Sequence, residues 1–119
     1  MDERIRQALA QEKTIDITTI GRRSGEPRRL EIWFHNLAGK IYITGTPGKR
    51  DWYANLVANP EFTFHLKGQV AADLPARATP ITGPAERRAV LGQILAKREK
   101  PAELEKWLKE SPLVEVSLQ

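Results

Sequence analysis

The chain has 119 residues, of which 40% are hydrophobic and 29% are charged, and its formal net charge is +4. This balance predicts one soluble globular domain over residues 1–119. The chain has no cysteine and only two histidines, which excludes disulfides and thiolate catalysis and argues against a metal site. The first residues are charged and no apolar run is long enough to span a membrane, so we expect a cytoplasmic protein.

The first half of the chain is predicted to form a short helix followed by three strands. The spacing of the apolar residues places these elements at about residues 3–12, 14–20, 28–35 and 41–45. In the second of these strands, alternation directs Leu30, Ile32 and Phe34 toward the core. Trp33 and His35 would then lie on the opposite face, whose residue types suggest a function.

The second half is predicted to contain three helices and three further strands. The expected helices start near residues 46, 84 and 101, and the expected strands cover about 61–66, 69–81 and 113–118. Thr46 is a candidate N-cap, and Pro75 would confine its strand to a sheet edge or a bulge. Six short strands with helices placed late favour an α+β or mainly β fold, a six-stranded antiparallel barrel with peripheral helices, over a parallel doubly wound sheet.

The positive charge is concentrated in one part of the chain. Residues 21–50 hold seven basic and two acidic residues, a net charge of +5, whereas the rest of the chain sums to −1. A local surplus of this kind indicates an anionic ligand. At this point the ligand can be a phosphorylated small molecule, a nucleic acid or a lipid headgroup.

Two segments within this region have the composition of phosphate sites. The loop Gly21-Arg22-Arg23-Ser24-Gly25 offers two guanidinium groups, a hydroxyl and flexible backbone N–H groups, although a solvated hairpin loop has the same composition. The segment Gly45–Arg50 places two cations at an expected helix start, where the helix dipole favours an anion; ordinary capping is the alternative. Neither segment has the spacing of a nucleoside-triphosphate or dinucleotide loop.

Aromatic and histidine side chains are further candidates. Trp33, Trp52 and Tyr53 can stack on a planar ring, although packing in the core or at an interface is their more ordinary role. His35 and His65 can assist proton transfer, but no serine or carboxylate stands at a spacing that implies a triad. We therefore expect both histidines at a surface or an interface.

Three segments, taken in order, resemble the deazaflavin-dependent nitroreductase family. These segments are Thr18–Arg28, Asp51–Leu56 and Asn59-Pro60. The similarity extends from about Ile15 to Phe64, and more loosely through residues 76–81 and the helix from Pro84. It implies a split β-barrel related to the FMN-binding pyridoxamine-phosphate-oxidase-like proteins.

The resemblance further implies an oxidoreductase that binds reduced coenzyme F-420, a deazaflavin, and passes its hydride to a quinone, nitro or enone acceptor. The implied cofactor-binding residues are Arg22, Arg23, Ser24 and Gly25, at the phosphate or polyglutamyl tail, and Thr46, Lys49 and Trp52, at or beside a second contacting loop. No catalytic residue is assigned, because the chain ends without a tyrosine that could lie over a substrate. No proton donor is assigned either, and Tyr53 is one candidate.

Three alternatives remain open at this point. The barrel can bind FMN instead of F-420, or it can hold a cofactor without turning it over. The pairs Arg22-Arg23 and Arg28-Arg29 also suit a nucleic-acid-binding barrel, but eight aromatic residues, several of them expected in the core, are few for a stacking platform. We therefore expect a small-molecule cofactor and acceptor as partners, no nucleic acid, no membrane, and a homodimer as one possible assembly.

Overall fold

The computed structural model describes all 119 residues. In chain order the elements are α1 (Glu3–Gln11), β1 (Thr14–Ile20), β2 (Pro27–Trp33), β3 (His35–Leu37), β4 (Lys40–Thr44), α2 (Asp51–Ala58), β5 (Glu61–Lys67), β6 (Ala71–Pro80), α3 (Pro84–Lys97), the 3-10 turn η1 (Pro101–Glu103), α4 (Leu104–Glu110) and β7 (Leu113–Leu118). None of the helices has both the length and the apolar character that a bilayer span requires.

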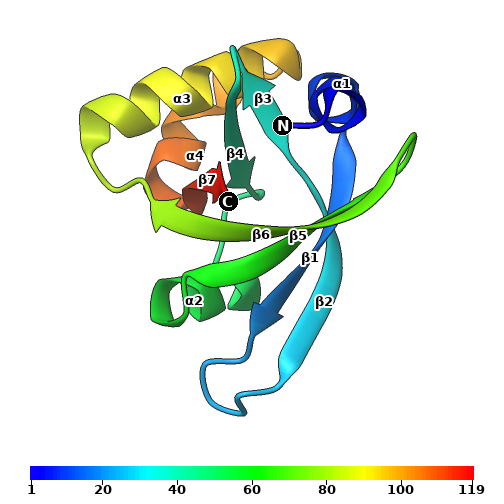
Figure 1. Ribbon diagram of the computed structural model, residues 1–119. Helices are drawn as coiled ribbons and strands as arrows, with labels where there is room; N and C mark the ends of the chain where they lie inside the picture. Colours follow the sequence, from blue (N-terminus) through cyan, green and yellow to red (C-terminus); the bar gives the residue numbers. More distant parts are fainter.

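All strands belong to one antiparallel sheet in the order β2-β1-β5-β6-β7-β4-β3. The two strands at its ends, β2 and β3, are consecutive in the chain, so the sheet curls back on itself into a half-barrel. Figure 1 shows α2 beside the lower end of this half-barrel, and α1 and α3 at its upper end. The predicted antiparallel split barrel with peripheral helices is thereby confirmed.

The sheet has seven strands instead of the predicted six because the second predicted strand is divided. β2 ends at Trp33, and β3 starts at His35, which pairs with Tyr42 of β4. Between them Phe34 is 3% exposed, and its N–H donates to the carbonyl of Lys13 at 3.0 Å. Because Phe34 packs in the core and leaves the β1 ladder, the chain crosses there from one edge of the sheet to the other.

The core lies inside the curled sheet. Ile15 and Ile17 of β1 and Phe64 of β5 are fully buried there, and α2 adds Trp52 and Leu56. A second, smaller cluster connects the helix pair α3–α4 to the sheet; its members include Tyr42, Leu91, Ile94, Leu95, Trp107 and Leu113. Burial of each large apolar side chain contributes about 1.5–3 kcal/mol. These two clusters therefore fix the positions of β2, α2 and the end of α3, which surround the candidate sites.

The strand that contains Pro75 differs from its prediction. β6 is unbroken and lies between β5 and β7, so the expectation of an edge strand or a bulge is wrong. The Pro75 carbonyl accepts a hydrogen bond from the N–H of Gln119 at 2.9 Å, just beyond the end of β7. The proline therefore lies opposite the end of β7, where its missing N–H leaves no residue of that strand without a hydrogen-bond partner.

The helix after β4 starts later than predicted. α2 begins at Asp51, with Arg50 at the N-cap position and no side-chain cap, so the assignment of Thr46 as N-cap is wrong. The carbonyl and the hydroxyl of Thr46 instead accept hydrogen bonds from the Arg50 guanidinium, at 2.9 and 2.5 Å. Residues 45–50 form a loop in which Gly48 has a φ of +127°, a conformation that side chains rarely adopt.

Candidate functional site

The loop between β1 and β2 and the start of α2 enclose a hollow of about 380 Å³. Three arginines, Arg22, Arg23 and Arg28, line it on the loop and β2 side, and Trp52 and Asn55 line it on the α2 side. The β1–β2 hairpin projects from the end of the half-barrel where α2 lies (Figure 1). Three of the seven basic residues counted in residues 21–50 therefore lie together at one end of the half-barrel.

The loop itself is a tight hydrogen-bonded turn. The N–H of Gly21 donates to the Glu26 carbonyl and the N–H of Gly25 to the Gly21 carbonyl, each at 2.9 Å. The Ser24 hydroxyl accepts a hydrogen bond from the Glu26 N–H at 3.1 Å. Gly25 has a φ of +71°, which strains any residue with a side chain. Both glycine N–H groups are therefore used within the loop and are not available to an anion.

Asn55 of α2 holds the loop in place. Its side-chain oxygen accepts hydrogen bonds from the backbone N–H of Arg22 at 3.0 Å and from Arg22 Nη1 at 3.1 Å. Its amide nitrogen donates to Thr19 Oγ1 at 3.4 Å, and Asn55 is 5% exposed. Sequence reasoning missed this residue, although a polar side chain on the apolar face of a helix needs a buried partner.

The cations around this hollow fall into two groups. Arg22 is bound to Asn55 and also forms an ion pair with Asp51 at 3.4 Å, and Arg50 donates to carbonyls of its own loop. In contrast, the side chains of Arg23, Arg28 and Lys49 take part in none of the ion pairs or hydrogen bonds of the structure. These three side chains are therefore free to bind an anionic ligand.

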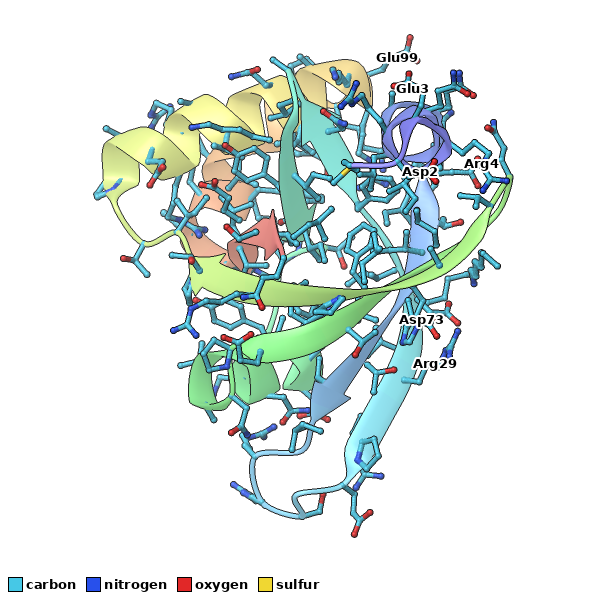
Figure 2. The ribbon with its side chains drawn as sticks, viewed as in Figure 1. Asp2, Glu3, Arg4, Arg29, Asp73 and Glu99 are labelled. Carbon is cyan, nitrogen blue, oxygen red and sulfur yellow. The ribbon has the colours of Figure 1, made fainter.

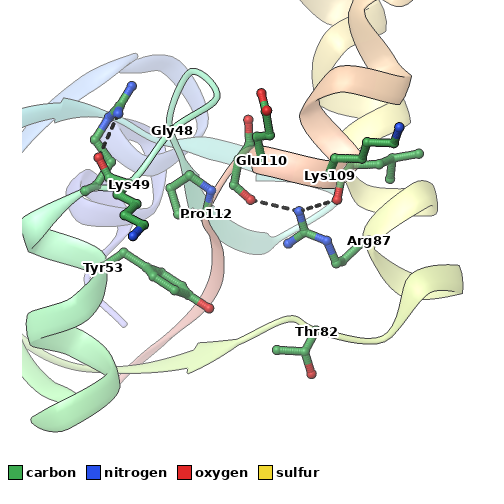
Figure 3. A pocket seen from close by; sticks show the side chains of 11 residues that line it. Gly48, Lys49, Tyr53, Thr82, Arg87, Lys109, Glu110 and Pro112 are labelled. Atoms are coloured by element: carbon green, nitrogen blue, oxygen red, sulfur yellow. Dashed lines mark hydrogen bonds between the residues drawn. The ribbon is translucent and has the colours of Figure 1, made fainter.

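Two more hollows adjoin the first one along α2. One of about 500 Å³ is lined by Arg22, Lys49 and Tyr53, and the next, of about 640 Å³, shares Lys49 and Tyr53 with it. Figure 3 shows the Tyr53 ring and the Lys49 chain reaching into the larger cavity. The Arg87 guanidinium on its far side donates to the carbonyls of Leu108 and Ser111, at 3.0 and 2.8 Å. Arg87 therefore ties α3 to the end of α4 and is already occupied.

The structure brings most of the sequence-predicted cofactor residues together. Arg22, Arg23, Ser24 and Trp52 line the first hollow, and Lys49 lines the next two. Gly25 and Thr46 line none of the three. Trp52 is 6% exposed and packs mainly in the core, so it offers a ligand only the part of its ring that borders the hollow.

A second cationic hollow, of about 420 Å³, lies at the other end of β2. Trp33 lines it with 45% of its surface exposed, and the Arg98 guanidinium carbon lies 5.2 Å from the centre of the Trp33 ring. Burial, together with the positive charges of Arg98 and Lys97, lowers the pKa of His35 from 6.5 to about 4. His35 is therefore a neutral imidazole above about pH 4, packed beneath cations.

This lowered pKa predicts a pH dependence of stability. Between pH 6.5 and 4 the unfolded chain protonates His35 while the folded chain does not, so stability falls as the pH falls through this window. Allowing for partial exposure, the loss is about 1–2 kcal/mol. Urea unfolding at pH 7, 5.5 and 4.5 should show this loss in the wild type and a smaller one in His35→Gln. If the free energy of unfolding fell equally with pH in the two proteins, the assignment of His35 as a neutral imidazole would be wrong.

His65 is buried, contrary to the expected surface position. It is 6% exposed, its Nε2 lies 2.7 Å from Thr18 Oγ1, and its Nδ1 lies 2.7 Å from Asp73 Oδ1. Its hydrogen bond lowers the pKa of Asp73, and Figure 2 shows Asp73 beside Arg29 on the outer face of the sheet. None of the hollows described above is lined by these residues, so the row of hydroxyl, imidazole and carboxylate stabilises the sheet face.

Comparisons with solved structures support the fold. The conserved hypothetical protein Rv2991 from Mycobacterium tuberculosis is 18% identical, with a TM-score of 0.75 over all of this chain and 81% of its own. An F420-H2 dependent reductase (FDR-A) is 20% identical, with a TM-score of 0.65 over 91% of this chain and 95% of its own. HutZ, a heme storage protein from Vibrio cholerae, is 13% identical, with a TM-score of 0.68 over 99% of this chain and 89% of its own. One fold thus serves proteins of different function.

The comparison with protein families gives a more specific result than the comparison with solved structures. The model of the family described as F420H(2)-dependent quinone reductase matches residues 2–117, almost the whole chain. The matched range includes the loop of residues 21–25, the hollows along α2 and the hollow beside Trp33. The chain therefore belongs to the F420H(2)-dependent quinone reductase family.

Proposed function

We propose that this protein is an oxidoreductase that binds reduced coenzyme F-420 and catalyses hydride transfer to a quinone, nitro or enone acceptor. Family membership supports the cofactor class. The single observation that carries the proposal is the set of unpaired cations, Arg23, Arg28 and Lys49, around hollows along one helix. Such a set suits a ligand with more than one anionic group.

The residues of the first hollow fit the phosphate of the cofactor. Arg23 and Arg28 reach it from the loop and from β2, and each guanidinium can offer two hydrogen bonds to phosphate oxygens. The start of α2 borders the same hollow and adds the positive end of a helix dipole. Asn55 and Arg22 keep the loop in position, while Lys49 is placed for the more distant carboxylates of a polyglutamyl tail.

Two apolar side chains of β2, Leu30 and Ile32, form a short strip between Arg28 and the Trp33 end of the strand, although Trp33 itself points to the other face. Leu30 and Ile32 point toward the interior, yet both stay half-exposed because β2 is an edge strand with β1 as its only neighbour. From Arg28 to Trp33 the strand advances about 16 Å, room for a planar ring system between the phosphate and the Trp33 hollow. We place the ring along this strip and the acceptor beside Trp33. The bound deazaflavin would supply the hydride, and the protein would supply orientation.

A titration tests the proposal. The purified protein is mixed with F-420 and, separately, with FMN, and fluorescence is followed at low and moderate salt. We expect F-420 to bind about tenfold more tightly than FMN, a difference of about 1.4 kcal/mol, because only F-420 carries tail carboxylates for Lys49. Reduced F-420 should then be oxidised by at least one quinone, nitro or enone acceptor.

Each alternative predicts a different outcome of the same experiment. Tighter binding of FMN would assign the barrel to flavin chemistry. Tight binding of F-420 without turnover of any acceptor would make the protein a cofactor-holding protein. Failure to bind either cofactor, together with oligonucleotide binding that falls steeply with salt, would overturn the proposal in favour of nucleic acid.

A further inference from the structure

The hollow beside Trp33 is lined by cations from segments that are far apart in the sequence. Lys13 follows α1, and Lys97, Arg98 and Lys100 come from the end of α3 and the turn after it. Glu12 is the only carboxylate in the lining. None of the ion pairs in the structure includes any of the four cations. A cavity of about 420 Å³ is therefore lined by four cations and one carboxylate, with no ion pair among them.

One of these cations is held against aromatic rings. The guanidinium carbon of Arg98 lies 5.2 Å from the centre of the Trp33 ring and 5.8 Å from that of Trp107. Trp107 is 1% exposed and belongs to the core under α3, so it anchors Arg98, whereas Trp33 is open to the cavity. The hollow thus combines a flat aromatic wall with a planar cation, and both favour a flat ligand.

His35 also lines the hollow, beside these cations. Its Nε2 is buried and has no hydrogen-bond partner. Its lowered pKa has burial as the main cause, with the charges of Arg98 and Lys97 next. The cations are therefore close enough to disfavour another positive charge, and by the same interaction they favour a negative one.

We propose that the hollow beside Trp33 is an acceptor subsite that selects flat acceptors carrying a negative charge, such as carboxylated or sulfonated quinones, over neutral ones. The inference rests on the proposed function for the identity of the reaction. A quinone bound there would take up the hydride and one proton from water and become the hydroquinone; the reduced deazaflavin would lose the hydride and release one proton to water, so electrons and protons balance. The anionic substituent takes no part in the reaction and is held by Arg98 and its neighbouring lysines.

The first test measures binding without turnover. Naphthalene-2-sulfonate and its neutral analogue naphthalene-2-sulfonamide are titrated calorimetrically into the F-420-bound protein and into the free protein. We expect the sulfonate to bind about tenfold more tightly at low salt, as for a charge-assisted contact, and the preference to shrink at high salt. The preference should disappear in Arg98→Gln and weaken in Lys100→Gln. Arg88→Gln removes an exposed α3 cation that is paired with Glu105, and it should leave the preference unchanged.

A second readout locates the ligand. The sulfonate should raise the pKa of His35 above its value of about 4, because an anion compensates the neighbouring cations. The imidazole resonance of His35, assigned with His35→Gln, reports this shift by NMR. Equal affinity for the two analogues, or a preference that survives Arg98→Gln, would overturn the inference.

Turnover links the subsite to the reaction. With 1,2-naphthoquinone-4-sulfonate and 1,2-naphthoquinone as acceptors, Arg98→Gln should reduce the kcat/KM ratio of charged to neutral quinone about tenfold, a change of about 1.4 kcal/mol. Failure of the proposed function would be recognised separately: the free protein would still prefer the sulfonate but would not bind F-420. An unchanged ratio in a protein that binds and oxidises reduced F-420 would instead reject the subsite alone.

Discussion

Replacing Arg23 with alanine should weaken F-420 binding about 10- to 100-fold and leave the melting temperature nearly unchanged. Arg23 is exposed and has no partner in the protein, so its removal breaks no contact of the fold. Each charge-assisted hydrogen bond that it gives to a phosphate is worth about 1.5–3 kcal/mol. The loss should be larger at low salt, where the lost charge is less screened. Fluorescence titration and thermal unfolding measure the two quantities.

Two further arginine variants serve as controls for Arg23. Arg77 pairs with Glu61 away from the hollows, so Arg77→Ala removes the same charge and should leave F-420 affinity within about twofold, consistent with the small energies of exposed pairs. Arg22→Ala should lower stability as well as affinity, because Arg22 is bound by Asn55 and Asp51. If Arg23→Ala lowered the melting temperature as much as Arg22→Ala, Arg23 would have a structural role and the assignment would fail.

Replacing Asn55 with alanine should destabilise the protein by about 2–3 kcal/mol, because it leaves the Arg22 N–H and the buried Thr19 hydroxyl without their partner. The loop of residues 21–25 would also lose its attachment to α2. We therefore expect F-420 affinity to fall together with stability, in contrast to Arg23→Ala. Urea unfolding gives the first quantity and fluorescence titration at a temperature below the transition gives the second.

The same helix provides the matched control. Asn59, at the C-cap of α2, has no side-chain hydrogen bond, so Asn59→Ala should change stability by less than about 0.5 kcal/mol. Asn55→Asp keeps the oxygen that accepts from Arg22 and should recover part of the affinity. Wild-type stability and affinity in Asn55→Ala would show that the loop does not depend on this residue.

Much of the sheet follows from local patterns in the sequence. Alternation located β1, β5 and β7, because one face of each strand packs into the core. The division at Phe34 was missed, since the alternation of Leu30, Ile32 and Phe34 continues across it without a glycine or proline to mark a break. What divides the strand is the exchange of β1 for β4 as its neighbour, a property of the folded sheet and not of the segment.

The candidate site was predictable in part. Arg22 and Arg23 are adjacent and lie in a region of surplus charge, so their loop was found from sequence. Asn55 was not found, because its partners, Arg22 and Thr19, lie 33 and 36 residues away. The hollow beside Trp33 was not predicted for a similar reason. Its cations come from segments near the two ends of the chain, and the net charge of all residues outside 21–50 is close to zero.

The strand β2 also fixes the distance between the hollow lined by Arg28 and the hollow lined by Trp33. Arg28 and Trp33 are five positions apart on one extended strand that is paired along its length with β1. A residue inserted between them would lengthen the path by about 3.3 Å and turn the following side chains to the opposite face of the sheet. A change of length in the turn of residues 22–25 would alter neither the path length from Arg28 to Trp33 nor the face to which the side chains of β2 point. In the proposed complex, the length of β2 between Arg28 and Trp33 would therefore set the size of the ligand that can reach both hollows.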